Sequence, residues 1–173
     1  MIRLAGFSMI GLSCSGLGVW YAWQLRQRLE HLHAMNRIIE LLVSLLQYGK
    51  STLPECCRQL AAQAQEPYRQ AFTQVYQLMA ENKGDSFAEV YAEIMGKALK
   101  GINALKEQDR QLFLQCVLQQ GCGDTETGIR LIRRQQELLK ERITRLEAEH
   151  REKSRMAVGL GTLGGILLII ILL

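Results

Sequence analysis

The side chains best suited to nucleophilic, redox or metal chemistry in this chain of 173 residues are its thiols. The cysteines are Cys14, Cys56, Cys57, Cys116 and Cys122. They form no pair of Cys-x-x-Cys motifs of the kind that bind zinc, and adjacent Cys56 and Cys57 point in different directions on a helix. Their number is odd, and all but Cys14 lie in a segment assigned below to the reducing cytoplasm, so no disulfide framework is implied. We therefore interpret them as buried packing residues and expect neither metal nor cofactor; a thiol-dependent sensor is the alternative.

The three histidines, His31, His33 and His150, do not resemble a catalytic set. His31 and His33 are two positions apart, so their side chains diverge on a helix. The sequence places no base beside a Ser or Cys nucleophile, and it has no GxxxxGK[ST] phosphate loop. We predict no catalytic residues and a protein that is not an enzyme.

Two long uncharged segments lie near the two ends of the given sequence. Residues 4–23 carry no charge over 20 positions, and residues 156–173 carry none over 18. A helix of about 20 apolar residues crosses a hydrocarbon core of about 30 Å. Trp20, Tyr21 and Trp23 are aromatic residues typical of the membrane interface. We predict an N-terminal transmembrane helix at 1–24, a helical domain at 25–155 and a C-terminal transmembrane helix at 156–173. A cleaved signal peptide is the alternative at the N-terminus, but no small-residue cleavage site follows the apolar run.

Charge predicts how the spans are oriented. Of 21 Lys and Arg residues only Arg3 precedes the first span, so 20 lie between the spans. Those nearest the spans are Arg26, Arg28, Arg151, Lys153 and Arg155. The positive-inside rule therefore predicts a multi-pass membrane protein with a cytoplasmic middle domain. Seventeen acidic residues are interspersed with these cations, which indicates a solvated surface and no nucleic-acid partner. The basic flanks would attract anionic membrane lipid.

The segment between the spans has the periodicity of an all-α protein. We predict a long first helix ending at Tyr48-Gly49, then helices at 54–65, from Pro67 to residue 81, from residue 87 to an end near Gly96 or Gly101, and at 107–120. A long last helix starts at Asp124 or Thr125 and continues into the second span. It carries a narrow apolar seam, formed by Ile129, Ile132, Leu139, Ile143 and Leu146. Ser51 or Thr52, and Asp85 or Ser86, are the expected cap residues. The result is a six-helix type of domain whose long first and last helices pack antiparallel.

Small residues recur in the second predicted span. Ala157, Gly161 and Gly165 are spaced by four, which gives one helix face a groove where another backbone approaches closely. The packing partner is a helix of the same chain or of another copy. The simpler alternative is that glycine is common in membrane helices.

A series of short motifs carries a family resemblance. Tyr48-Gly49 is followed by Leu53-Pro54-Glu55, then by Gly121 and Asp124, then by Lys153, Arg155, Gly159 and Gly161 before the terminal apolar run. In this order and spacing the chain resembles the stage III sporulation protein AB family over essentially its whole length. That family is similar, in its helical domain, to the inner-membrane platform proteins of type II secretion and type IV pilus systems.

The resemblance implies a non-enzymatic platform subunit of a sporulation channel, in the mother-cell membrane that surrounds the forespore. It implies other membrane subunits and a cytosolic hexameric ATPase as partners, and it is compatible with a homo-oligomer. Tyr48, Gly49, Pro54, Gly121 and Asp124 are the candidate partner-contact positions, although a plain helix-turn-helix joint explains the first three more simply. Apolar Val43 and Leu45 depart from the acidic residues expected there, which puts partner contacts on that face in doubt. A membrane-anchored helical scaffold unrelated to secretion is the alternative function.

Overall fold

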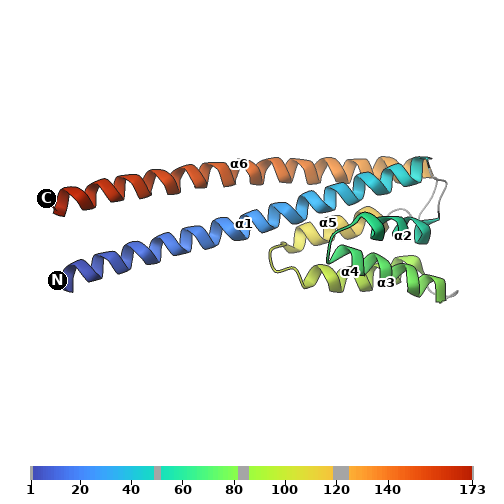
Figure 1. The fold of residues 1–173 in the computed structure, drawn as a ribbon. Helices are drawn as coiled ribbons and strands as arrows, with labels where there is room; N and C mark the ends of the chain where they lie inside the picture. The colour runs from blue at the N-terminus through green and yellow to red at the C-terminus, as the bar shows by residue number, and fades with distance from the viewer. Residues whose placement is uncertain (1, 49–51, 82–85, 119–124, 173) are drawn as a thin grey trace. The chain divides into compact units, whose positions relative to one another are not determined.

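The structure is a computed structural model, which describes the backbone of residues 2–48, 52–81, 86–118 and 125–172. Side chains are described for residues 20, 23–48, 52–81, 86–118 and 128–152. Within the described residues the chain is all-α, with no strand. Its helices are α1 (Ile2–Tyr48), α2 (Leu53–Gln63), α3 (Tyr68–Glu81), α4 (Phe87–Lys100), α5 (Glu107–Leu118) and α6 (Thr125–Leu172) (Figure 1). The all-α fold and its long first and last helices are thus confirmed.

The chain divides into two compact units. One, which we call the terminal unit, comprises Met1–Leu29 with Thr144–Leu173. The other, which we call the helical body, is Glu30–Ile143. No helix is long and apolar enough to cross a membrane within the residues whose side chains the structure describes. The predicted spans at 1–24 and 156–173 lie almost entirely outside those residues.

In the helical body, α1 and α6 run antiparallel. Arg133 Nη2 lies 3.1 Å from Gln47 Oε1, and Lys140 Nζ lies 3.1 Å from Glu40 Oε1, so the numbering rises along one helix as it falls along the other. The predicted pairing of the first and last helices is confirmed here. The predicted apolar seam of α6 is also confirmed, because Ile129, Ile132, Leu139 and Ile143 are buried.

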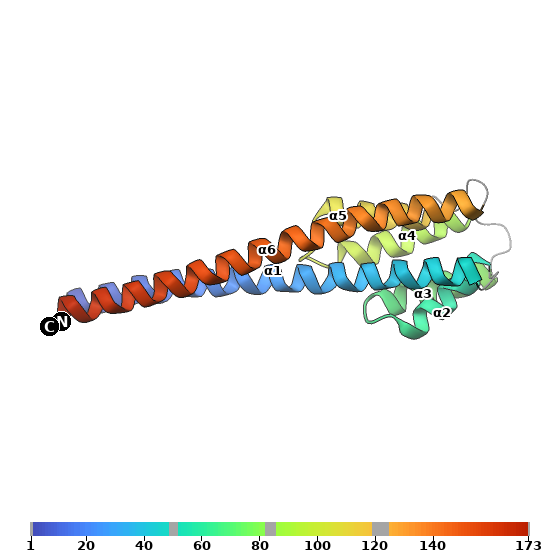
Figure 2. The same ribbon diagram turned by 90° about the horizontal axis from the view of Figure 1, so that it is seen from above.

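The short helices α2–α5 supply the rest of the core. Their largest fully buried side chains are Tyr68, Phe72, Tyr91 and Phe113. The rings of Tyr68 and Phe113 meet edge to face with centroids 5.9 Å apart, and those of Phe72 and Tyr91 have centroids 6.4 Å apart. Figure 2 shows α2 and α3 together as a pair beside the helical-body part of α1. Aromatic contacts thus connect α3 to both α4 and α5.

The helix starts lie within one residue of their predicted positions, but the caps form differently. Thr52 and Ser86 precede α2 and α4 with extended backbones, yet neither side chain makes a capping hydrogen bond. The main chain serves the exposed amides instead: the Ser86 carbonyl accepts from Glu89 and Val90, at 3.0 and 3.2 Å. The expected side-chain caps are wrong at these two residues. The other two candidates, Ser51 and Asp85, lie outside the described residues.

Of the two predicted end points of α4, Gly96 and Gly101, the structure supports the second. The helix continues through Gly96, so this glycine does not end it. Its last residue is Lys100, and the following Gly101 keeps a right-handed backbone, with φ of −66° and ψ of −15°. The α5 helix is described through Leu118, and its predicted last two residues, 119 and 120, lie outside the described residues.

Candidate functional site

The predicted partner-contact positions lie around the end of α1. Tyr48 is the last residue of α1 and is 85% exposed. The Gln47–Arg133 hydrogen bond brings the beginning of α6 beside it. Pro54 lies half-buried in the first turn of α2. Gly49, Gly121 and Asp124 lie outside the described residues. An exposed aromatic residue at a helix end is a side chain of the kind that anchors protein interfaces.

The packing positions predicted in the second span fall within α6. Ala157, Gly161 and Gly165 belong to its helical backbone, but their side chains lie outside those that the structure describes. The spacing-based groove therefore stays a prediction.

Three cysteines are described, and all are free and buried: Cys56, Cys57 and Cys116. Burial raises the pKa of Cys57 to about 12, with a smaller contribution from Cys56, and it raises the pKa of Cys116 to about 12. Burial also raises the pKa of Cys56, assisted by Glu55. Thiols held protonated in this way are poor nucleophiles and poor metal ligands. Their interpretation as packing residues fits this environment; Cys14 and Cys122 lie outside the side chains that the structure describes.

His31 takes part in packing and not in a metal cluster. Its Nδ1 lies 3.3 Å from the Tyr68 hydroxyl, and the two rings meet edge to face at 6.1 Å. Burial lowers the pKa of His31, with partial opposition from Glu30, so the neutral ring is favoured. The contact joins α1 to α3. Among the described residues no group of three or more His, Cys, Asp or Glu side chains could hold a metal ion.

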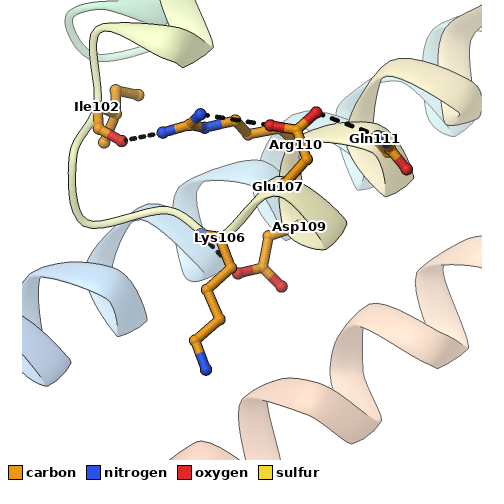
Figure 3. A network of polar contacts seen from close by, with 6 residues as sticks. All are labelled: Ile102, Lys106, Glu107, Asp109, Arg110 and Gln111. Carbon is orange, nitrogen blue, oxygen red and sulfur yellow. Dashed lines mark hydrogen bonds and ion pairs between the residues drawn. The ribbon is translucent and has the colours of Figure 1, made fainter.

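A buried carboxylate connects α5 to α6. Asp109 is fully buried, and its Oδ1 accepts a hydrogen bond from Arg142 Nη1 at 3.1 Å. Its Oδ2 accepts from the Lys106 backbone amide at 3.3 Å, which is the reciprocal half of a capping box at the start of α5. Figure 3 shows this carboxylate directed toward the backbone at Lys106. The sequence alone does not identify Asp109, because an acidic residue in a first helical turn gives no sign that it is buried.

The neighbouring Arg110 fastens the α4–α5 connection. Its Nη2 donates to the Ile102 carbonyl at 2.9 Å, and its Nη1 lies 3.4 Å from Glu107 Oε2 (Figure 3). Gln111 also donates to Glu107, at 3.3 Å. The connection from Gly101 to Lys106 is thus tied to the first turns of α5.

A polar layer lies between α1 and α6. Gln136 is buried and donates through Nε2 to Asn36 Oδ1 at 3.2 Å and to Glu40 Oε1 at 3.0 Å. The same Glu40 oxygen accepts from Asn36 Nδ2 and lies 3.1 Å from Lys140 Nζ. Buried polar contacts of this kind favour one alignment of two helices over its neighbours.

Two surface grooves flank α3. A groove of about 460 Å³ lies between α3 and α4, with Leu78 and Ile94 among its apolar lining residues. Glu93 and Lys97 at its edge neutralise each other, with Lys97 Nζ 2.6 Å from Glu93 Oε1. A second groove, of about 450 Å³, lies between α2 and α3 and is lined by Arg58, Ala61, Ala62, Arg69, Thr73 and Tyr76. The sequence gives no signal for this second groove, since its arginines are eleven positions apart on different helices.

Comparisons with known proteins agree on one family. The family model described as stage III sporulation protein AB matches residues 3–173. A solved structure of stage III sporulation protein AB (SpoIIIAB) is similar with a TM-score of 0.53 and 19% sequence identity, covering 76% of this chain and 97% of that chain. At this identity the likeness shows a shared fold. No curated protein matches significantly. Because the family model covers nearly the whole sequence, the chain belongs to the stage III sporulation protein AB family.

Proposed function

We propose that this chain is a non-enzymatic membrane platform subunit of the sporulation channel between mother cell and forespore, and that its helical body docks a cytosolic hexameric ATPase. One observation carries the proposal. The two helices that the Gln136 contacts hold together in the helical body, α1 and α6, each continue unbroken into an uncharged run at their own end of the chain. A helix pair of this kind passes a load from a partner on the body to the membrane anchors.

The chemistry of the described side chains supports a role without catalysis. The groups that could react are used for packing: the thiols of Cys57 and Cys116 are buried and protonated, and the His31 ring packs against Tyr68. The buried carboxylate of Asp109 is bound by Arg142 and by a main-chain amide. These are the features of a rigid body that holds partners.

The location follows from charge. The flanking Arg26, Arg28 and Arg151 orient residues 25–155 toward the cytoplasm under the positive-inside rule. The anchors at 1–24 and 156–173 then assemble with other membrane subunits. Exposed Tyr48 is the described position best suited to contact the ATPase at the end of α1.

Topology is tested in intact cells with single cysteines on a cysteine-free background. The exposed Ala80 on α3 is replaced by cysteine in one strain and Ile2 in another, each protein is produced in the plasma membrane of non-sporulating cells, and a membrane-impermeant maleimide is added before lysis. We expect protection of Ala80→Cys and labelling of Ile2→Cys. Labelling of Ala80→Cys would reverse the orientation and remove the body from any cytosolic ATPase.

Partner binding is tested with the full-length protein in lipid nanodiscs and the purified cognate ATPase. We expect direct binding, and we expect Tyr48→Ala to weaken it by about tenfold or more, the usual cost of removing an aromatic anchor. Gln77→Ala, an exposed change on α3, is the control. The docking proposal fails if the wild-type protein shows no binding to the ATPase.

A further inference from the structure

The groove between α2 and α3 has a distinctive composition. The six described residues that line it include two arginines and no acidic residue. Its volume of about 450 Å³ falls within the range of about 300–1,000 Å³ typical of binding clefts. The groove therefore combines room for several side chains with a net positive charge, which comes from Arg69 because Arg58 pairs with Glu55.

Each arginine is held in place while still presenting donors. Arg69 Nε donates to the Ala64 carbonyl at 3.1 Å, next to the end of α2. Arg58 donates through Nε and Nη2 to Glu55 Oε1 on its own helix. Among the described residues, none accepts a hydrogen bond from Nη1 of Arg58 or from either terminal nitrogen of Arg69. Pre-oriented guanidinium groups of this kind are well suited to bind carboxylates with two parallel hydrogen bonds.

Between the arginines the groove is apolar. Ala61 and Ala62 contribute methyl groups, and the half-buried Tyr76 contributes its ring. The Thr73 hydroxyl turns back to donate to the Arg69 carbonyl at 2.8 Å, so that its proton is used within α3. An apolar floor between two cations matches a partner segment that carries both acidic and apolar side chains.

The neighbouring groove differs from this one in the net charge of its lining. The groove between α3 and α4 has nearly the same volume, about 460 Å³, but its Glu93 and Lys97 pair with each other. It consequently offers no excess charge that would select a partner. The two grooves form a natural test pair within one helical body.

We propose that the α2–α3 groove is the docking site for an acidic segment of a partner protein, with Arg58 and Arg69 binding its carboxylates and the floor of Ala61, Ala62 and Tyr76 receiving an apolar side chain. Tyr and Arg are the residue types enriched in the energetic centres of protein interfaces, which favours a protein over a lipid headgroup. The inference rests on the proposed function only in naming the cytosolic ATPase as the protein that supplies this segment.

The test compares two charge reversals of equal size in the full-length protein in neutral nanodiscs. R58E/R69E alters the groove, and K97E/K100E changes the same amount of charge on α4. We expect ATPase affinity to fall about tenfold or more in R58E/R69E, because charge-assisted hydrogen bonds are lost, and to change less than about threefold in K97E/K100E. Equal losses in the two variants, or no loss in R58E/R69E, would overturn the proposal.

A second probe separates this proposal from the choice of ATPase. A fluorescent helical peptide of Leu-Glu-Glu-Leu repeats should bind the wild-type protein, and it should lose binding in R58E/R69E or when its Glu residues become Gln. If the ATPase does not bind the wild-type protein, the proposed function fails and the peptide result alone decides on the groove. Absence of peptide binding to the wild-type protein would then overturn the groove proposal.

Two further measurements test whether the groove binds lipid instead and whether the R58E/R69E variant is folded. Phosphatidylserine vesicles should bind wild-type protein and R58E/R69E equally, and a selective loss in R58E/R69E would assign the groove to a lipid headgroup instead. Circular dichroism and thermal unfolding report whether R58E/R69E is folded. If it is not folded, R58K/R69K is used to test the groove instead. Lysine keeps the positive charge but lacks the planar guanidinium that binds a carboxylate through two parallel hydrogen bonds. We expect lysine to weaken binding, and unchanged binding would contradict docking through the guanidinium forks.

Discussion

The short helices and the long helix α6 join the helical body by different means. The short helices meet through buried rings, as in the contacts of Tyr68 with Phe113 and of Phe72 with Tyr91. Helix α6 has an apolar seam too, but polar contacts from Gln136 and Arg142 to neighbouring helices accompany it. Apolar burial stabilises without direction, whereas hydrogen-bonded groups penalise misalignment. From this difference we expect α2–α5 to contribute mainly stability and α6 to depend also on a defined register.

The largest expected effect comes from the aromatic core. Phe72 is fully buried, so Phe72→Ala should lower the free energy of unfolding by about 3–5 kcal/mol through lost burial and a cavity. Urea denaturation followed by circular dichroism measures this. Phe87→Ala, at a half-buried ring that stacks on Tyr91 with centroids 5.8 Å apart, should cost less. Equal costs would contradict the assignment of stability to the fully buried rings.

The next effect concerns the α5–α6 contact. Asp109→Asn removes the charge that pairs with Arg142 and should cost about 1–3 kcal/mol of unfolding free energy. The arginine is 37% exposed and can turn toward water, which limits the penalty. A double-mutant cycle with Arg142→Gln separates the pair from other contacts of Asp109. Strictly additive losses would show that the two residues do not stabilise each other.

A smaller effect on stability, but a clear effect on alignment, is expected at Gln136. Replacing a buried polar residue by an apolar one of similar size is often neutral, so Gln136→Leu should change the unfolding free energy by less than about 1 kcal/mol. Crosslinking of Gln47→Cys to Arg133→Cys with a short bismaleimide, on a cysteine-free background, reports the register of α1 and α6. We expect this crosslinking to fall in Gln136→Leu. Unchanged crosslinking would mean that the apolar seam alone sets the register.

The smallest effect is the pH dependence of the α1–α3 contact. The pKa of His31 in the folded protein is lowered below its ordinary value of 6.5, chiefly by burial. The unfolded chain therefore binds this proton more readily, and the stability contributed by neutral His31 is present above 6.5 and is lost as the pH falls below it.

Thermal unfolding between about pH 5 and pH 8 measures this dependence. We expect His31→Gln to flatten the profile below the ordinary histidine pKa, while His33→Gln, at an exposed neighbour, serves as the control. An identical slope in wild type and His31→Gln would assign the pH dependence to other groups.

The sequence predicts the helices well because glycine, proline and periodic apolar residues are local signals. Pro54 lies in the first turn of α2, and the predicted seam residues Ile132 and Leu139 are fully buried in α6. It does not predict the polar contacts, because these depend on tertiary neighbours: Asp109 is buried by elements that include α6, and its partner Arg142 is 33 positions away.

The candidate binding positions show the same division. Tyr48 is found at a helix end, as predicted, and is exposed. Arg58 and Arg69 converge on one groove only because α2 and α3 pack against each other. In the sequence alone, a single arginine in a helix is interpreted as a solvated surface residue. Charge on one helix therefore becomes a site only once the partner helix is placed.

The fastened connection between α4 and α5 bears on how the protein survives proteases. Trypsin cleaves after lysine and arginine, and the exposed Lys100 and Lys106 lie at the two ends of this connection. Cleavage requires several residues to be drawn out into an extended conformation, and here Ile102 and Leu105 are buried while the Ile102 carbonyl is bound by Arg110. Trypsin should therefore spare this segment until the helical body itself opens.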